Sequence, residues 1–193
     1  MAAIRSVAVF CGSRPGDRTD FVAAARALGR GLAQADMRLV FGGGRIGLMG
    51  AVADAALAAG GDVIGVIPEF LTRLEVAHGG LGELVVTDSM HARKQRMYEL
   101  SDAFVVLPGG LGTMDEAMEV ITWRQLRLHD KPILLCDVAG SAAPLVAAIE
   151  ATVARGFAPP EARCLFQVTT GVAATLAALG AMPRGSGGPA GLM

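Results

Sequence analysis

The residues best able to do chemistry lie in a glycine-rich run at positions 108–113, Pro-Gly-Gly-Leu-Gly-Thr, between an apolar stretch and a helical pattern. Free N–H groups at a helix start and the positive end of its dipole form an anion site. Glycines let a phosphate approach the backbone where a Cβ would block it. No Gly-Lys-Ser/Thr follows, so the run is not a Walker-type triphosphate loop. We expect it to bind a monophosphate.

Glu116, just beyond this run, has two interpretations. The spacing Thr113-x-x-Glu116 is that of a capping box, in which the carboxylate accepts a hydrogen bond from the Thr113 N–H. A carboxylate beside a phosphate site could instead activate water and stabilise an oxocarbenium-like sugar, as glycosidic cleavage requires. The local pattern leaves both interpretations open.

A second cluster follows at 89–97, Ser-Met-His-Ala-Arg-Lys-Gln-Arg-Met. On a helix, Arg93 shares a face with Met90 and Met97, so it is not a simple solvated charge. Its guanidinium could bind a phosphate or a carboxylate with two hydrogen bonds. Lys94 lies beside it, and His91 is interpreted as a packing or helix-start residue.

The run at 42–47 formally spells Gly-x-Gly-x-x-Gly, and Asp62 follows 20 residues after its first glycine. This resembles the dinucleotide fingerprint, but the ribose-binding acid should end the next strand, whereas Asp62 begins it. We therefore predict a second wall of a nucleotide site. The third glycine-containing turn, Cys11-Gly12-Ser13, would lie at the same end of the sheet. Cys11 could line a site there, but a passive buried thiol is the favoured interpretation.

Short β-branched runs alternate with longer Ala-rich helical patterns along the chain. Such alternation predicts an α/β fold: a doubly wound parallel sheet with helices on both faces and ligands at the carboxyl ends of the strands. We expect one domain over residues 1–182 and a flexible Gly/Pro-rich tail over 183–193. Strands are expected at 6–11, 38–41, 62–67, 83–87, 103–107, 132–136 and 166–169, and helices at 20–34, 47–59, 89–101, 113–128, 142–155 and 171–179.

Composition narrows the function classes. The 193 residues carry a formal net charge of −1, which gives no electrostatic footprint for nucleic acid or an anionic membrane. Apolar stretches are too short to span a bilayer, and the N-terminus lacks the pattern of a signal peptide. The three cysteines, Cys11, Cys136 and Cys164, fit neither a disulfide framework nor a zinc site. We expect a cytoplasmic protein.

Four motifs, taken in order, resemble the LOG (LONELY GUY) family. They are Phe-Cys-Gly-Ser at 10–13, Gly-Gly-Gly-x-x-Gly-Leu-Met-Gly at 42–50, Met-His-x-Arg-Lys at 90–94 and Pro-Gly-Gly-x-Gly-Thr-x-x-Glu at 108–116. The resemblance extends from Ser6 to about Leu179. Members are cytokinin riboside 5′-monophosphate phosphoribohydrolases, long mislabelled as lysine decarboxylases.

The resemblance implies a Rossmann-like fold and a homodimer with its sites near the interface. It implies hydrolysis of an N6-substituted AMP to the free base and ribose 5-phosphate, with no metal or organic cofactor. Arg93 and Glu116 match the catalytic pair. The matched substrate-binding positions are Glu75, Lys94, Gly109, Gly110, Leu111, Gly112, Thr113, Met114, Asp115 and Thr122, and further lining is expected from Ser13, Gly43, Gly44 and Met90.

One matched position departs from the family pattern, because the usual Pro-Arg-Glu-like approach to the base-side acid reads Thr-Arg-Leu-Glu before Glu75. For Glu116 the resemblance favours catalysis, and a cap that fixed the carboxylate rotamer would be compatible with it.

Other functions stay open. A broader nucleosidase acting on plain AMP would keep the same residues, and a non-catalytic carrier of a nucleotide or of molybdenum cofactor could keep the glycine loop. A lysine decarboxylase would need a Schiff-base lysine for pyridoxal phosphate. Lys94 and Lys131 are the two lysines in the chain, and the sequence around neither of them indicates a Schiff-base lysine.

Overall fold

The computed structural model describes residues 3–72 and 78–185, and within them seven strands form one parallel sheet. The spatial order is β4-β3-β2-β1-β5-β6-β7, so the chain reverses direction across the sheet between β1 and β5. The strands are β1 (Ser6–Phe10), β2 (Arg38–Phe41), β3 (Val63–Pro68), β4 (Glu83–Thr87), β5 (Ala103–Val106), β6 (Ile133–Asp137) and β7 (Gln167–Thr170).

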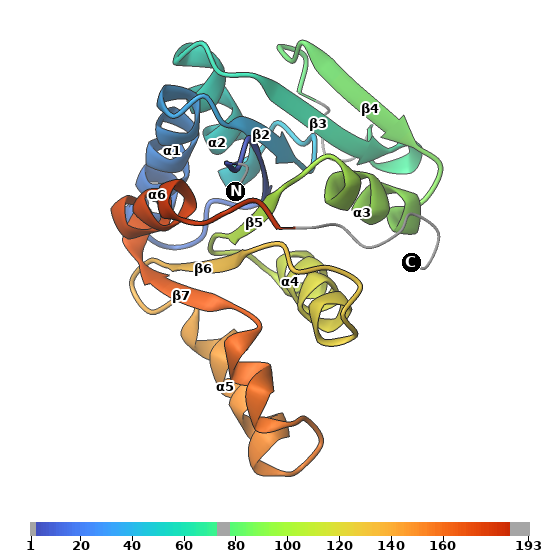
Figure 1. Ribbon diagram of the computed structural model, residues 1–193. Coiled ribbons are helices and arrows are strands. Elements are labelled where there is room, and N and C mark those ends of the chain that lie inside the picture. Colours follow the sequence, from blue (N-terminus) through green and yellow to red (C-terminus); the bar gives the residue numbers. More distant parts are fainter. Residues whose placement is uncertain (1–2, 73–77, 186–193) are drawn as a thin grey trace.

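Helices cover both faces of this sheet (Figure 1). One face carries α1 (Thr19–Gln34), α2 (Gly47–Ala58) and α6 (Gly171–Ala181). The other carries α3 (Met90–Glu99), α4 (Leu111–Gln125) and α5 (Ala143–Ala154). Two short 3-10 turns, η1 (Glu69–Leu71) and η2 (Pro160–Cys164), complete the described elements.

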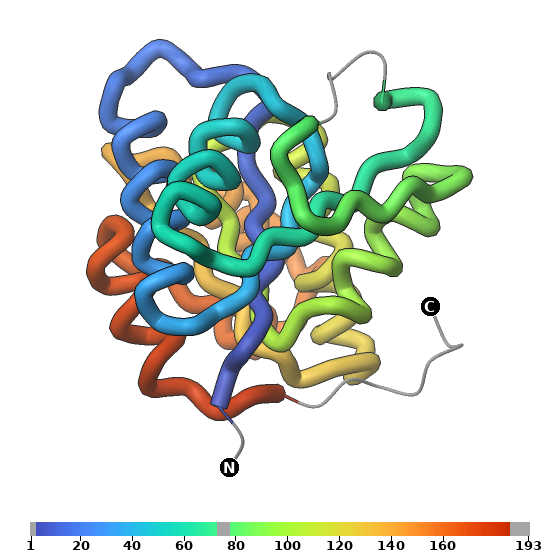
Figure 2. The backbone as a smooth tube through the Cα atoms, turned by 90° about the horizontal axis from the view of Figure 1, so that it is seen from above, coloured from blue at the N-terminus to red at the C-terminus, as the bar shows by residue number. Residues whose placement is uncertain are grey.

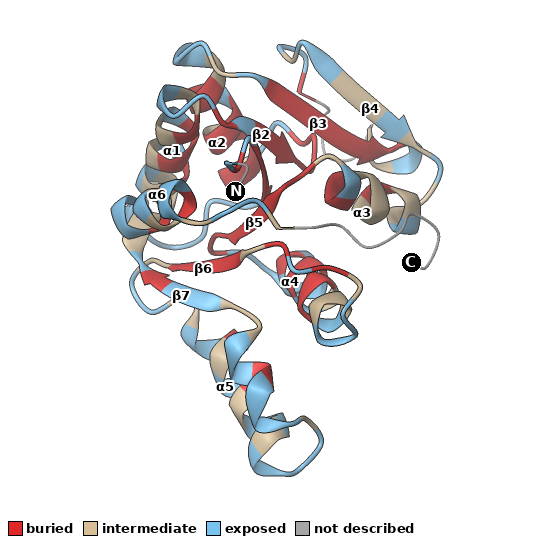
Figure 3. Ribbon diagram, in the orientation of Figure 1, coloured by how far each residue is buried: buried red, intermediate tan, exposed pale blue. Residues whose placement is uncertain are grey.

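Two apolar cores result from the alternation of side chains along each strand. In β1, Val7 and Val9 contribute to the core under α1 and α2, while Ala8 and Phe10 contribute to the core under α3 and α4. All five β1 residues are buried, as expected for a strand covered on both faces. Figure 3 shows the central strands buried and the edge strands β4 and β7 more exposed.

The predicted α/β architecture is confirmed, with every expected strand and helix present and most ends shifted by one to three residues. The largest shifts are at α4, which begins at Leu111 and ends at Gln125 rather than 128. Arg127 has a positive φ of 60°, a left-handed conformation that stops the helix one residue after its C-cap. The two 3-10 turns were not predicted.

The reversal point brings the loops after β1 and β5 side by side. The Gly12 N–H donates to Pro108 O over 3.0 Å, and the Leu107 N–H donates to Phe10 O over 2.9 Å. In open α/β sheets such a reversal opens a crevice at the carboxyl ends of the strands. The fold therefore places the Pro-Gly-Gly loop and the Cys-Gly-Ser turn at one crevice.

The two ends of the described chain meet at the end of the sheet opposite the crevice, where the strands begin (Figure 2). Ala3 forms an antiparallel bridge with Pro183, and Arg184 Nε lies 2.7 Å from the Asp102 carboxylate. The first residues of the predicted tail thus contact the domain, and residues 186–193 lie outside the described residues. Within the described residues, no helix has the length and apolar character needed to cross a membrane.

Candidate active site

A cavity of about 710 Å³ opens at the reversal point of the sheet. The loop after β1 forms one wall and the Pro-Gly-Gly loop forms the opposite one, with α1, α2 and α3 contributing side chains. The lining residues are Cys11, Gly12, Ser13, Arg14, Pro15, Gly16, Phe21, Leu48, Met49, Leu71, Met90, Arg93, Pro108, Gly109, Gly110, Leu111, Gly112, Thr113, Glu116 and Ser141.

The start of α4 faces this cavity with its backbone amides. Gly110 is the N-cap and makes no side-chain cap, and Met114 is the first residue whose N–H bonds back, to Gly110 O over 3.1 Å. A helix leaves the earlier N–H groups, those of Leu111, Gly112 and Thr113, without an internal acceptor. They offer hydrogen bonds and a positive dipole end to an anion in the cavity.

Gly109 allows the loop to close on Thr113. A Cβ on Gly109 would collide with the Thr113 side chain, which is itself buried. A larger residue at 109 would therefore push the helix start away from the loop. The glycine is required here by close packing, because its φ is not in the left-handed region.

Glu116 forms a buried ion pair with Arg93. Arg93 Nη1 lies 3.0 Å from Glu116 Oε1, and each side chain is 8% exposed. The predicted capping box is wrong, because α4 starts at Leu111 and both Thr113 and Glu116 lie inside it. The carboxylate is instead oriented by the guanidinium of Arg93 on α3, and this ion pair fixes its position.

Arg93 is itself held by contacts other than its pair with Glu116. Its Nε–H donates to Val66 O over 3.1 Å, and a Cβ on Gly42 would collide with its guanidinium. Ser89 caps α3, with its Oγ accepting the Ala92 N–H over 3.1 Å. These contacts leave the guanidinium little freedom, which suits a group that must orient a carboxylate.

Cys11 lies at the cavity wall near this pair. Burial raises the pKa of its thiol far above the ordinary range, the Glu116 charge raises it further, and the Arg93 charge lowers it. The thiol is therefore neutral at physiological pH, which excludes it as a thiolate nucleophile. Cys11 is thus buried, as the favoured interpretation expected, and it also lines the cavity, as the alternative expected.

A family model described as "possible lysine decarboxylase" matches residues 49–179. A cytokinin riboside 5′-monophosphate phosphoribohydrolase of Rhodococcoides fascians is 47% identical over 176 residues, covering 91% of this chain and 89% of the relative. Another from Arabidopsis thaliana is 45% identical over 159 residues, covering 82% of this chain and 75% of the relative. The chain belongs to the LOG family of phosphoribohydrolases.

Solved structures share the fold at lower identity. The molybdenum cofactor carrier protein of Chlamydomonas reinhardtii superposes with a TM-score of 0.68 at 22% identity, covering 91% of this chain and 95% of that one. The molybdenum cofactor binding protein of Rippkaea orientalis gives 0.68 at 19% identity, covering 93% and 96%. At such identities the likeness concerns the fold alone.

The structure brings most of the residues matched to the LOG family together at the cavity. Their shared property is that each faces the space between the loops after β1 and β5. They are Ser13, Met90, Arg93, Gly109, Gly110, Leu111, Gly112, Thr113 and Glu116.

Other matched residues lie outside the cavity lining. Lys94 Nζ lies 3.1 Å from Asp115 Oδ2 and 3.0 Å from Glu119 Oε1, so the lysine links α3 to α4. Partial burial lowers its pKa, but the hydrogen bonds to these two carboxylates outweigh this and raise it above the ordinary value.

Thr122, another matched residue, is exposed on α4. Glu75 lies outside the described residues.

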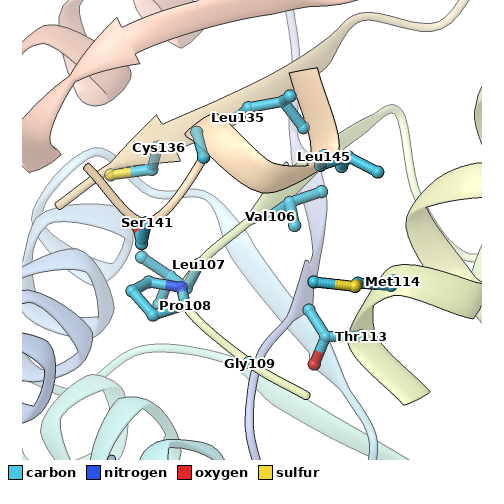
Figure 4. A pocket seen from close by; sticks show the side chains of 11 residues that line it. Val106, Leu107, Pro108, Gly109, Thr113, Met114, Leu135, Cys136, Ser141 and Leu145 are labelled. Atoms are coloured by element: carbon cyan, nitrogen blue, oxygen red, sulfur yellow. The ribbon is translucent and has the colours of Figure 1, made fainter. Parts of the chain in front are cut away.

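Met114 faces a different, much smaller cavity of about 30 Å³ behind the Pro-Gly-Gly loop. Figure 4 shows Thr113 and Met114 on one side of it and Leu135, Cys136 and Leu145 on the other. The walls of this small cavity are mostly apolar, which suits side-chain packing better than ligand binding. Within the described residues, no three His, Cys, Asp or Glu side chains come together as metal ligands would.

The second glycine loop of the LOG pattern supports the cavity from behind. Gly43 and Gly44 are buried but do not line it. Gly47, with a φ of 63°, packs so closely that a Cβ would collide with the Ser13 backbone. Asp62 pairs with Arg38 over 2.6 Å and does not line the cavity.

Sequence reasoning missed several lining residues, including Arg14, Phe21, Leu71 and Ser141. One signal was available: Gly16 has a φ of 77°, and a Cβ there would meet the Phe21 ring. A glycine five residues before an aromatic at the start of α1 indicates a loop folded onto that ring. Ser141 and Leu71 come to the cavity from distant parts of the chain, and no local sequence pattern predicts their place there.

Proposed function

We propose that this chain hydrolyses the N-glycosidic bond of a nucleoside 5′-monophosphate, with an N6-substituted AMP as its preferred substrate. Water adds across the bond, giving the free base and ribose 5-phosphate. One observation carries the proposal: the buried Arg93–Glu116 pair and the open N-terminus of α4 line the same cavity. A phosphate and an anomeric carbon of one substrate could then meet their partners together.

The start of α4 supplies the phosphate site in this proposal. The amides of Leu111, Gly112 and Thr113 bind phosphate oxygens, and Gly112 has open space around its Cα. The global charge of −1 cannot attract a nucleotide, so recognition depends on this local set of donors.

Glu116 supplies the chemistry. It accepts the proton of the attacking water or stabilises positive charge developing at the anomeric carbon. Arg93 holds the Glu116 carboxylate through the buried ion pair. A buried negative charge without such a partner would cost several kcal/mol. The neutral Cys11 thiol adds no competing charge at this wall.

An apolar region of the cavity supports an apolar substituent on the base. The cavity lining includes five large apolar side chains, those of Phe21, Leu48, Met49, Leu71 and Met90. Burying an apolar chain there would be favoured by about 25 cal/mol per Å² of surface removed from water. This favours an N6-alkylated base over plain adenine.

We also propose that two copies associate through α4. One stripe of this helix exposes large apolar side chains next to the cavity mouth: Leu111 is 87% exposed, and Met114, Met118 and Leu126 follow at helical spacing. The exposed Thr122 lies on the same stripe, so a partner copy would bring it near a site. Sedimentation velocity would report a dimer, and Met118→Glu would give monomers if this face is the interface.

The described cysteines support the expected compartment. Cys11 and Cys136 are buried free thiols and Cys164 is an exposed one. Free exposed thiols persist in a reducing environment, so we propose the cytoplasm. Fractionation of cells making the tagged protein would test this.

The deciding experiment measures base release from AMP, isopentenyl-AMP, isopentenyladenosine and ATP by chromatography. Cleavage of the monophosphates, fastest with isopentenyl-AMP, is expected. Equal rates with AMP would instead make the protein a general nucleotide nucleosidase. No release from any of the four, with AMP still bound, would contradict hydrolysis and favour a carrier.

A further inference from the structure

A short segment before β6 contacts the two helices that carry the candidate catalytic pair. His129 and Lys131 are both buried, at 5% and 6% exposed. The His129 Nδ1 accepts the Lys131 N–H over 3.1 Å, so its proton is on Nε2. That Nε2–H donates to Val120 O of α4 over 2.9 Å. The segment is thereby fixed to α4.

Lys131 reaches the other helix. Its Nζ donates to Tyr98 O, in the last turn of α3, over 2.7 Å. The same Nζ lies 3.7 Å from the centroid of the Tyr98 ring. An ammonium group at a helix C-terminus and over an aromatic face is stabilised by both the helix dipole and the ring. The charged form of Lys131 therefore fixes the end of α3.

Aromatic packing joins the two helices at the same level. The Tyr98 ring meets Trp123 of α4 edge to face, with centroids 5.3 Å apart, and stacks on Phe104 of β5 at 6.0 Å. Lys131 thus contacts the side chain that forms the α3–α4 contact, as well as the backbone of α3. Figure 1 shows the two helices on the same side of the sheet.

The catalytic pair lies further toward the N-terminal ends of these helices. Arg93 precedes Tyr98 by five residues, about 7.5 Å along α3, and Glu116 precedes Val120 by four, about 6 Å along α4. A helix turn transmits a shift at one end to the other with little loss, since its backbone is hydrogen-bonded throughout. Lys131 does not line the cavity, so it can act on the reaction only through α3 and α4.

We propose that Lys131 is a positioning residue: its ammonium group fixes α3 against α4 and so sets the geometry of the Arg93–Glu116 pair. This inference rests on the proposed hydrolysis for its kinetic consequences, but the helix contact itself can be tested without turnover. A misplacement of about 1 Å in a reacting group can cost about 100-fold in rate.

The charge of Lys131 depends on pH near neutrality. Burial lowers its pKa to about 8; Asp102 and Glu99 oppose this and Arg184 adds to it. His129 faces the same cluster but burial lowers its pKa to about 4, so it stays neutral. Above pH 8 the native state loses the proton that the unfolded chain keeps. The contribution of this group to stability then increases as pH rises, so thermal melts over the same pH range distinguish a loss of rate from unfolding.

The experiment compares the wild type with Lys131→Met, Lys131→Arg and the control Arg163→Met, which removes an exposed cation paired with Glu150. Two readouts are followed from pH 6.5 to 9.5: kcat and KM with isopentenyl-AMP, and the emission of Trp123, the single tryptophan of the chain. Thermal melts identify variants that fail to fold.

We expect Lys131→Met to lower kcat at least tenfold with KM within about threefold, and Arg163→Met to change neither. Wild-type kcat and Trp123 emission should both titrate near pH 8, and Lys131→Arg should keep most of kcat and abolish both titrations. Wild-type kcat in folded Lys131→Met, or titrations unchanged in Lys131→Arg, would overturn the inference. Emission that titrates in a wild type without turnover would support the contact and refute the hydrolysis.

Discussion

Two glycine-rich loops of this protein look alike in sequence but present their helix starts differently. Each follows a buried strand and precedes a helix, at 42–47 before α2 and at 108–113 before α4. At α2, the N–H groups of Leu48 and Met49 already donate to Gly12 O, over 3.0 and 3.3 Å. At α4, the corresponding amides face the cavity.

This difference shows that a glycine motif does not by itself make an anion site. In the first loop the neighbouring backbone occupies the donors, and the glycines serve close packing against Ser13 and Arg93. In the second, the donors stay available beside a charged pair. Whether an amide is free is decided by what the fold places in front of it.

Glu116→Gln should give the largest effect, because it removes the negative charge on which the proposed hydrolysis depends. We expect kcat to fall by at least about 10³-fold, with AMP affinity within threefold. Base release and calorimetric titration with AMP would measure the two.

Glu119→Gln is the matched control, since Glu119 lies on the same helix, pairs with Lys94 and does not line the cavity. Retained turnover in Glu116→Gln would refute the assignment. Lost AMP binding with a lower Tm would reduce Glu116 to a structural role.

Gly47→Ala tests the closed loop. The substitution forces a methyl group into the Ser13 backbone at a φ of 63°. We expect a loss of about 3 kcal/mol of unfolding free energy, which corresponds to a Tm lower by about 10 °C. Calorimetry would measure it, and an unchanged Tm would mean that the packing of this loop is not tight.

Gly112→Ala tests the open loop and should do the opposite. Its Cβ would meet no atom within 4 Å, so the first turn of α4 should tolerate it and the Tm should rise slightly. The added methyl would stand where phosphate approaches, and we expect AMP affinity to fall about 30-fold. Equal affinity in this variant would place the phosphate elsewhere.

Phe21→Ala tests the apolar part of the cavity lining. Removing the ring should lower kcat/KM for isopentenyl-AMP about tenfold more than for AMP, because apolar contact with the substituent is lost. Competition assays with the two substrates would show it. A uniform decrease would mean that the ring supports the loop at 12–18 rather than the substituent.

Lys94→Met should give the smallest effect of the five. The lysine joins α3 to α4 through Asp115 and Glu119 at a site where its side chain is 15% exposed, outside the cavity. We expect kcat to fall about threefold and KM to stay unchanged, because the lysine contacts α4 without lining the cavity. A large rise in KM would restore its predicted role in substrate binding.

Local sequence patterns determined much of the fold. Apolar strands buried on both faces, Ala-rich helices and glycine turns specify α/β alternation because each depends on neighbours in the chain. The same locality explains the capping-box error. Thr113 and Glu116 have the right spacing, but the helix starts two residues earlier than expected.

Four motifs in order were enough to identify the LOG family from the sequence, and with it the residues of the Pro-Gly-Gly loop. Lys131 shows the limit of that approach. The residues around it in the sequence suggested no role, yet the fold buries it at the end of α3 and against Tyr98. Neither contact leaves a local pattern, because 33 residues separate the two partners.

The sequence by itself thus determined the strands, the helices, the family and the glycine-rich loop of the proposed phosphate site. Tertiary structure alone decided that Glu116 pairs with Arg93, that Gly12 O occupies the donors of α2, and that Lys131 joins α3 to the segment before β6. The physical reason is one of range. Propensity and turn chemistry act over a few residues, whereas ion pairing and donor satisfaction depend on which distant segments the packed sheet brings together.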